Sequence, residues 1–104
     1  MDAFKEIAAE EAGRMLQAGS ALFLDVRDPA SFEAAHVPGA LHLNDGNVSE
    51  FVDKTDKSKP LVVYCYHGQT SQGAAAYLLD QGFREVYSVI GGFERWRQIE
   101  KIES

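Results

Sequence analysis

The 104-residue chain has little of several residue types, and each scarcity excludes a class of protein. A single cysteine, Cys65, can form neither an intrachain disulfide nor a thiolate-rich metal site. The chain has ten Lys and Arg residues and sixteen Asp and Glu residues. The resulting net charge of −6 argues against nucleic acid or an acidic membrane surface as a partner. Because the length suits one hydrophobic core, we expect residues 1–104 to form a single domain.

Metal ligands and long apolar segments are also scarce. The three histidines, His36, His42 and His67, lack the close spacing of metal ligands, so we expect no metal site. No apolar run approaches the length that crosses a membrane, and the first residues lack the basic and apolar regions of a signal peptide. Together with the lone cysteine, which suits a reducing compartment, these features predict a cytoplasmic protein.

What the chain does have is a regular alternation of predicted strands and helices. Short apolar runs predict strands at residues 21–26, 40–43, 61–64 and 85–89, with a weaker strand at 5–7. Between them, helices are predicted at residues 9–18, 48–54, 71–79 and 93–99, and Asp28-Pro29 is typical of the start of a short additional helix. The alternation predicts an α/β fold, in which a central parallel sheet of about four to five strands carries helices on both faces.

Cys65 follows the predicted strand 61–64 and precedes the predicted helix 71–79, with a short polar loop at residues 66–70 between them. In parallel sheets, ligands bind at the carboxyl ends of the strands, where this cysteine falls. The N–H groups of the loop and of the helix start can point at the sulfur, stabilise its thiolate and hold a small anion beside it. The setting predicts a reactive nucleophile rather than an inert buried thiol.

Four segments of the chain match patterns known from one protein family. They are Asp25-Val26-Arg27-Asp28; Phe32 with His36-Val37-Pro38-Gly39-Ala40 and Leu43; Cys65-Tyr66-His67-Gly68-Gln69-Thr70; and Val89-Ile90-Gly91-Gly92-Phe93-Glu94-Arg95-Trp96. The second segment fits the family's amino-terminal signature at every constrained position, and the third has the length of its active-site loop. The fourth fits a second signature only in part, because Ile90 and Arg95 depart from it. By these segments the chain resembles the rhodanese family of sulfurtransferases, in particular the small single-domain bacterial thiosulfate sulfurtransferases of the GlpE type.

The resemblance implies a rhodanese-like three-layer fold and a specific chemistry at Cys65. In the family this cysteine carries sulfur as a persulfide, a covalent intermediate that needs no separate cofactor. The resemblance implies that the sulfur is cradled by the backbone amides of the loop and of the helix start, which here belong to Tyr66, His67, Gly68, Gln69, Thr70 and Ser71. Many members carry Arg or Lys in this loop. Since no loop position is basic here, an anion would be held mainly by main-chain groups.

The same resemblance implies the reaction partners. Thiosulfate would be the sulfur donor, and the acceptor would be cyanide, which yields thiocyanate, or a dithiol such as reduced thioredoxin. The reaction would follow a ping-pong scheme of two displacements on sulfur.

Two other functions use a similar arrangement. Cysteine-dependent phosphatases and arsenate reductases place an arginine six residues after the cysteine, where this chain has Ser71, and phosphoryl transfer needs that guanidinium. Inert rhodanese-like interaction modules typically lose the cysteine, which is present here. Stoichiometric carriage of sulfur to a partner lies between these functions and turnover, and it stays open.

Several side chains near these motifs have a plain structural interpretation. We expect His67 to be an exposed loop residue whose backbone N–H matters more than its ring, although a role as base or anion-binding cation stays open. We expect His36 to fix a turn by a hydrogen bond, and Asp25 and Arg27 to tie a strand end to nearby loops.

Overall fold

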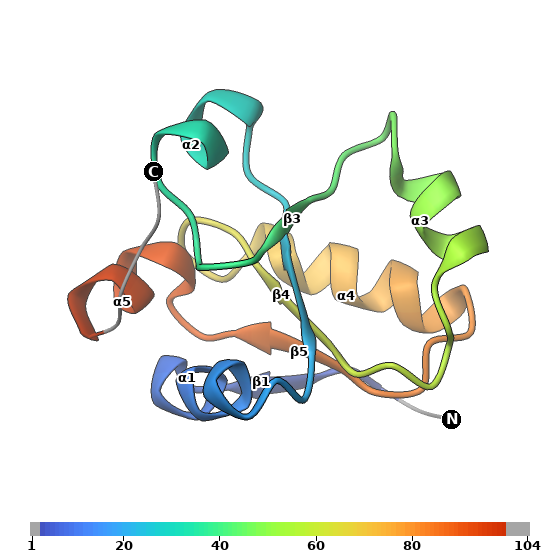
Figure 1. Ribbon diagram of the computed structural model, residues 1–104, viewed down its shortest axis with the longest axis horizontal. Coiled ribbons are helices and arrows are strands. Elements are labelled where there is room, and N and C mark those ends of the chain that lie inside the picture. The colour runs from blue at the N-terminus through green and yellow to red at the C-terminus, as the bar shows by residue number, and fades with distance from the viewer. Residues whose placement is uncertain (1–2, 100–104) are drawn as a thin grey trace.

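A computed structural model of the protein describes residues 3–99, in which five strands and five helices alternate (Figure 1). The strands are β1 (Lys5–Ile7), β2 (Leu22–Asp25), β3 (Leu41–His42), β4 (Leu61–Tyr64) and β5 (Val86–Val89). The helices are α1 (Ala9–Ala18), α2 (Pro29–Ala34), α3 (Val48–Lys54), α4 (Thr70–Asp80) and α5 (Gly92–Ile99).

All five strands form one parallel sheet in the order β1-β5-β4-β2-β3. Apolar residues of α1 and α5 pack on one face of the sheet, and those of α3 and α4 pack on the other. The predicted three-layer α/β fold with a parallel sheet is therefore confirmed, including its weak first strand.

The central strand β4 shows why this sequence folds into layers. All four of its residues are buried, as expected of a strand covered on both faces. Side chains alternate along a strand, so Val62 and Tyr64 enter the core beneath α1 and α5, whereas Leu61 and Val63 enter the core beneath α3 and α4. The continuous apolar run in the sequence is thus shared between two cores.

The predicted element boundaries agree closely with the structure, and one difference concerns the site. Helix α4 begins at Thr70 and not at residue 71 as predicted, so the prediction that Thr70 belongs to the loop is wrong. The physical reason is that Gln69 already has right-handed helical backbone angles, with φ −93° and ψ −53°. The helix therefore starts directly after Gln69, whose side chain does not cap it, so no capping residue in the sequence indicated this start.

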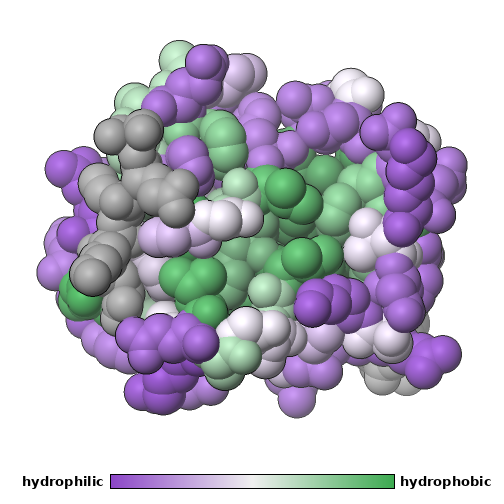
Figure 2. Space-filling view, viewed as in Figure 1, coloured by the Kyte–Doolittle hydropathy of each residue, from purple (hydrophilic) through white to green (hydrophobic). Residues whose placement is uncertain are grey.

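The surface seen in Figure 2 carries apolar side chains in its centre, over the β3 edge of the sheet, with hydrophilic side chains around them. Leu41 of β3 contributes to the exposed apolar surface, because it is 47% exposed. Within residues 3–99, no helix combines the length and apolar character needed to cross a membrane. The same residues contain no cluster of three or more His, Cys, Asp or Glu side chains able to hold a metal ion.

Candidate active site

The sulfur of Cys65 lies where β4 ends and α4 begins. The backbone N–H groups of Gly68 and Ser71 both donate to Sγ, each at a nitrogen–sulfur distance of 3.2 Å. No side chain caps α4 at Gln69, and Sγ accepts one of the helix's amino-terminal N–H groups in place of a cap. The sulfur therefore lies at the positive end of the helix dipole, where negative charge is stabilised.

The pKa of the Cys65 thiol lies below its ordinary value. Burial opposes this, because the residue is only 5% exposed and a thiolate loses hydration there. Hydrogen bonds outweigh burial: they come from the hydroxyl and N–H of Ser71 and from the N–H groups of Gly68 and His67. The lowered pKa increases the fraction of thiolate, which is the nucleophilic form of cysteine.

The orientation of these N–H groups is set from outside the loop by the start of α5. The Phe93 N–H donates to the carbonyl of Cys65 at 2.7 Å, and the Glu94 N–H donates to the carbonyl of Tyr66 at 3.1 Å. In a planar trans peptide, the C=O and the following N–H point in opposite directions. Because α5 holds the Tyr66 carbonyl outward, the N–H of His67 faces the sulfur side.

Gln72 holds the other half of the loop in the same way. Its Nε2 donates to the carbonyl of Gly68 at 2.9 Å and to the Glu6 carboxylate of β1 at 2.9 Å. Peptide planarity then directs the N–H of Gln69 away from Gln72. The loop thus has its carbonyls tied outward at both ends, which leaves its N–H groups for the sulfur and its ligands.

Two glycines make this close approach possible. A Cβ at Gly92 would lie 2.4 Å from the carbonyl oxygen of Cys65 and 2.5 Å from the carbonyl carbon of Tyr66, distances that real side chains do not reach. Gly68 has φ +91°, and a Cβ there would lie 3.0 Å from the backbone nitrogen of Gly91. Only glycine at these positions lets α5 reach the loop and lets the loop turn around one atom.

Although it is buried, Cys65 opens into a small mouth. A cavity of about 140 Å³ is lined by Val26, Arg27, Cys65, Tyr66, His67, Gln69 and Thr70. A second, larger hollow of about 620 Å³ shares Val26, Arg27 and Thr70 with the mouth and continues between the start of α3 and α4. Its walls are mainly apolar, with Val48, Ala74 and Leu78 among them. A small anion can therefore reach the cysteine through the mouth, and the hollow beside the mouth has room for a larger molecule.

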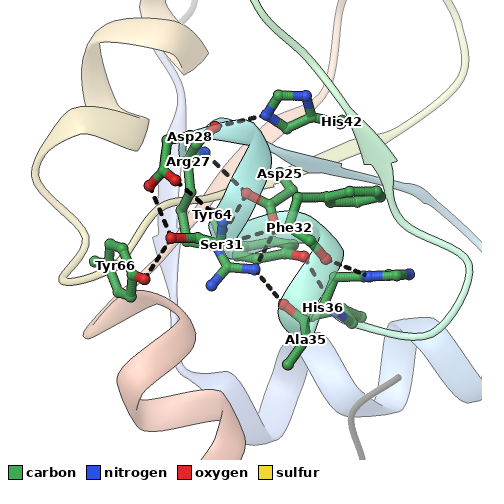
Figure 3. Close-up of polar contacts among 11 residues, drawn as sticks. Asp25, Arg27, Asp28, Ser31, Phe32, Ala35, His36, His42, Tyr64 and Tyr66 are labelled. Carbon is green, nitrogen blue, oxygen red and sulfur yellow. Dashed lines mark hydrogen bonds and ion pairs between the residues drawn. The ribbon is translucent and has the colours of Figure 1, made fainter. Parts of the chain in front are cut away.

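Arg27 and Asp25 form a buried ion pair beside the mouth (Figure 3). The Arg27 guanidinium lies 2.7 Å from Asp25 Oδ2 and also donates to the carbonyl of Ala35 at 2.6 Å. Its central carbon lies 4.1 Å from the ring centre of Phe93 and 5.2 Å from that of Tyr66. Burial alone would lower the pKa of Arg27, but the hydrogen bonds and charge of Asp25 raise it above the ordinary value. The pair ties the end of β2 to the α2 region, as its sequence position suggested.

Hydrogen bonds within helix α2 and from it to Tyr66 of the loop hold the helix beside the loop (Figure 3). Asp28 caps the helix by accepting the N–H of Ser31, and the Ser31 hydroxyl lies 2.6 Å from the Tyr66 hydroxyl. His36 fixes the end of this segment, since Nδ1 lies 2.8 Å from the carbonyl oxygen of Phe32 and the two rings stack. The turn-fixing role predicted for His36 is consistent with this geometry.

The predicted loop residues come together around the sulfur, but in different ways. Gly68 and Ser71 bond Sγ through their N–H groups, whereas Tyr66, His67 and Gln69 are exposed residues that line the mouth. The His67 ring lies beside the Tyr66 ring, with 6.0 Å between ring centres.

Sequence reasoning did not assign a role in the site to Gln72, to the side chain of Ser88 or to the N–H groups that begin α5. Arg27 was expected to tie a strand end but not to line the mouth. The paired glycines before Phe93 were the available signal for a close approach. No local pattern indicated Gln72 or Ser88, because the Glu6 partner of Gln72 and the Ser71 partner of Ser88 are distant in the chain.

Comparison with known proteins agrees with this geometry. A family model described as the rhodanese-like domain matches residues 8–99. A thiosulfate sulfurtransferase GlpE of Pseudomonas syringae pv. syringae is 52% identical over 93% of this chain and 91% of its own length, and one from Pseudomonas savastanoi pv. phaseolicola is 50% identical over the same shares. The chain belongs to the rhodanese family.

Solved structures support the fold assignment. The rhodanese-like domain of the Anabaena protein Alr3790 superimposes with a TM-score of 0.84 at 25% identity, covering 100% of this chain and 80% of that one. A Rhodopseudomonas palustris protein of unknown function, described as a possible tyrosine phosphatase, gives a TM-score of 0.83 at 26% identity, covering 96% of this chain and 85% of that one. The fold therefore does not by itself decide between sulfur and phosphoryl transfer, and the residues of the loop have to do so.

Proposed function

We propose that this protein is a thiosulfate sulfurtransferase that moves sulfane sulfur through a persulfide on Cys65. The observation that carries the proposal is the set of N–H groups aimed at a lone sulfur whose pKa is lowered. Two relatives at 50% and 52% identity are named for this activity, which supports the choice of donor.

In the first half-reaction, the Cys65 thiolate attacks the outer sulfur of thiosulfate. A bond forms between Sγ and that sulfur, the sulfur–sulfur bond of thiosulfate breaks, and sulfite leaves with the bonding electron pair. The persulfide so formed carries its negative charge on the outer sulfur. N–H groups fixed before the reaction can hold this charge with no reorganisation, and we assign this role to the amides of residues 66–70 and of Ser71.

In the second half-reaction, an acceptor attacks the outer sulfur of the persulfide. The acceptor keeps that sulfur, the bond from Sγ to it breaks, and the electron pair returns to Sγ as the thiolate. Cyanide gives thiocyanate in this way. A dithiol first gives its own persulfide; its second thiol then attacks the inner sulfur of that persulfide, a disulfide forms, and the outer sulfur leaves as hydrosulfide. Neither half-reaction needs a cofactor or a metal ion, because the transferred group is held covalently by the protein.

The hollow beside the mouth supports an acceptor larger than cyanide. It continues from the residues around Cys65, and its apolar wall at Ala74 and Leu78 suits the uncharged surface around an acceptor thiol. We therefore include dithiols and reduced thioredoxin among the acceptors. A reducing compartment such as the cytoplasm suits both this acceptor class and a cysteine that must stay free.

The phosphatase alternative is disfavoured by a specific residue. Ser71 stands where a phosphatase needs its arginine, and it lies wholly buried with its N–H directed at the sulfur. The buried guanidinium of Arg27 is already paired with Asp25, so it does not replace the missing group.

The test is an intact-mass measurement of wild-type protein and Cys65→Ser after treatment with thiosulfate. Wild-type protein should gain the mass of one sulfur atom, cyanide should remove it, and Cys65→Ser should gain nothing. Turnover of an aryl phosphate by wild-type protein, with no uptake of sulfur, would instead support the phosphatase alternative.

A further inference from the structure

Two buried serine hydroxyls extend from the sulfur into the interior of the protein. Ser71 is 0% exposed and Ser88 is 1% exposed. The Ser71 Oγ lies 3.5 Å from the Cys65 Sγ, within hydrogen-bonding range for sulfur, and 2.7 Å from the Ser88 Oγ. Ser88 belongs to β5, where its register partner is Val63 of β4, two residues before the cysteine. A continuous chain of polar contacts thus connects Cys65 to a residue that does not touch the sulfur.

The direction of this chain depends on the charge of the sulfur. Each hydroxyl has one proton to donate but can also accept. When Cys65 is a thiol, it donates to Ser71, and Ser71 donates to Ser88. When Cys65 is a thiolate, the order reverses: Ser88 donates to Ser71, and the Ser71 proton turns to Sγ. The hydroxyl of Ser88 is therefore what allows Ser71 to donate to the anion while its own oxygen stays satisfied in the buried interior.

We propose that Ser88, acting through Ser71, is a positioning residue that directs a hydroxyl proton toward Sγ whenever that sulfur carries negative charge. In terms of the proposed reaction, the charge appears on Sγ as the persulfide bond breaks. The two hydroxyls of Ser71 and Ser88 form this relay; both are buried, and neither lines the mouth through which donor and acceptor enter. It can therefore act in every cycle without contacting either of them.

Other charged and titratable groups near Cys65 belong to different elements and are held by other partners. Arg27 after β2 lines the mouth and is paired with Asp25. From the loop, the side chains of Tyr66 and His67 line the same mouth. Farther out, Glu6 of β1 bonds Gln72, and Glu94 of α5 pairs with Arg97. On the interior side, α4 places the uncharged hydroxyl of Ser71 next to the sulfur, and β5 places that of Ser88 against Ser71.

Removal of the relay should have opposite effects on the rates of the two half-reactions. This expectation rests on the proposed function. Without it the departing thiolate is less stabilised, so discharge of the persulfide to an acceptor slows. The same thiolate, once formed, is a stronger nucleophile, because nucleophilicity rises with pKa. Loading from thiosulfate at alkaline pH should then be maintained or faster. Removal of a merely structural contact would not slow discharge of the persulfide while maintaining the rate of sulfur loading.

The experiment measures the rate of Cys65 alkylation by iodoacetamide from pH 5 to pH 10 in wild-type protein, Ser88→Ala, Ser71→Ala and the double variant. For Ser88→Ala, we expect the midpoint of the profile to move to higher pH, with a rate at acid pH lower by about threefold and an alkaline plateau higher by about twofold. Ser71→Ala should show a larger shift in the same direction. The exposed Ser49→Ala in α3 is the matched control and should leave the profile unchanged.

The double variant decides whether Ser88 acts through Ser71. If it does, replacing Ser88 in the Ser71→Ala background has no further effect on the alkylation profile, so the two changes are not additive. Additive shifts, or an unchanged profile for Ser88→Ala, would overturn the relay. Should Ser88→Ala not fold, as judged by circular dichroism, Ser71→Ala provides the first test. This substitution removes the hydroxyl through which the relay contacts Sγ, so an unchanged alkylation profile would overturn the relay.

Failure of the relay and failure of the proposed function are distinguishable. Alkylation needs no sulfur donor, so a shifted profile supports the relay even if thiosulfate loads no sulfur. Normal sulfur loading with unshifted profiles would overturn the relay alone.

Discussion

Two groups that can carry negative charge lie at the carboxyl ends of neighbouring strands, and the protein holds them in different ways. The carboxylate of Asp25 ends β2, and the sulfur of Cys65 follows β4, its neighbour in the sheet. Asp25 is 0% exposed and is closed off by the guanidinium and the backbone N–H of Arg27. The Cys65 sulfur accepts from the N–H groups of Gly68 and Ser71 and lies in hydrogen-bonding range of the Ser71 hydroxyl, and it opens into a cavity.

The difference separates a structural anion from a reactive one. A bidentate guanidinium gives a carboxylate a full opposite charge and a fixed geometry, which suits a permanent buried charge. A set of dipoles lowers the pKa of the thiol and so favours the thiolate, yet leaves its electron pair available to attack a donor. Since the nucleophilicity of a thiolate falls as its pKa falls, moderate stabilisation is the better arrangement for a sulfur that must react twice in each cycle.

Breaking the structural pair should have the largest effect on stability. In Arg27→Met the buried carboxylate of Asp25 loses its partner, and we expect the free energy of unfolding to fall by about 3–5 kcal/mol, measured by urea denaturation. The double change Asp25→Asn with Arg27→Met removes the unpaired charge and should recover much of this loss. A loss below about 1 kcal/mol in the single variant would contradict the view that the pair is a buried structural charge.

At the Cys65 site, the largest loss of function is expected from a substitution of Gly92. A Cβ in Gly92→Ala would overlap the backbone of Cys65 and Tyr66, so α5 must move away from the loop. We expect a loss of stability of about 2–3 kcal/mol and a loss of sulfur loading of about 100-fold, from thermal unfolding and intact mass.

The control for this change is Gly39→Ala. Gly39 also has positive φ, +78°, but a Cβ there meets nothing within 4 Å. It should cost about 1 kcal/mol of stability through backbone strain and leave sulfur loading intact. Equal losses of loading in the two variants would show that strain, rather than contact between α5 and the loop, is responsible.

These contacts also show how far the sequence alone could predict the site. The run from Leu61 to Tyr64, the single cysteine and the polar loop are neighbours in the chain, so local patterns were enough to place Cys65 between a strand and a helix. The burial of β4 on both faces followed from the same apolar run. The β-α alternation then fixed the layers, because parallel strands need crossover connections.

What could not be predicted depends on contacts between distant parts of the chain. Ser88 reaches Ser71 only because β5 pairs with β4 in a register that places Ser88 opposite Val63. Gln72 reaches Glu6 across 66 positions of sequence. A shift of one residue in the pairing of β5 with β4 would turn Ser88 to the other face of the sheet, and the sequence contains no local signal of register.

A smaller effect is expected from Gln72, and it tests whether this side chain helps to orient the loop. Gln72→Leu removes the hydrogen bond that holds the Gly68 carbonyl outward, so the Gln69 N–H is less well aimed at the mouth. The loss of one hydrogen bond of about 1 kcal/mol predicts a KM for thiosulfate raised about fivefold, with little change in stability. Gln17→Leu, an exposed glutamine on α1, is the control. A KM that is unchanged by Gln72→Leu would show that the start of α5 alone orients the loop.

The smallest expected effect concerns the acceptor. It tests whether the space beside Cys65 admits a larger molecule, whereas Asp25 is closed off by Arg27. Ala74→Phe narrows the apolar hollow beside the mouth without touching the loop. We expect discharge of the persulfide to reduced thioredoxin to slow about threefold, a change of about 0.6 kcal/mol, while discharge to cyanide is unchanged. Ala76→Phe, at an exposed position of the same helix that does not line the hollow, should leave both rates unaltered. Because cyanide needs only the mouth, equal slowing of both acceptors would mean that the substitution disturbed the N–H groups around the sulfur rather than a surface used by the larger acceptor.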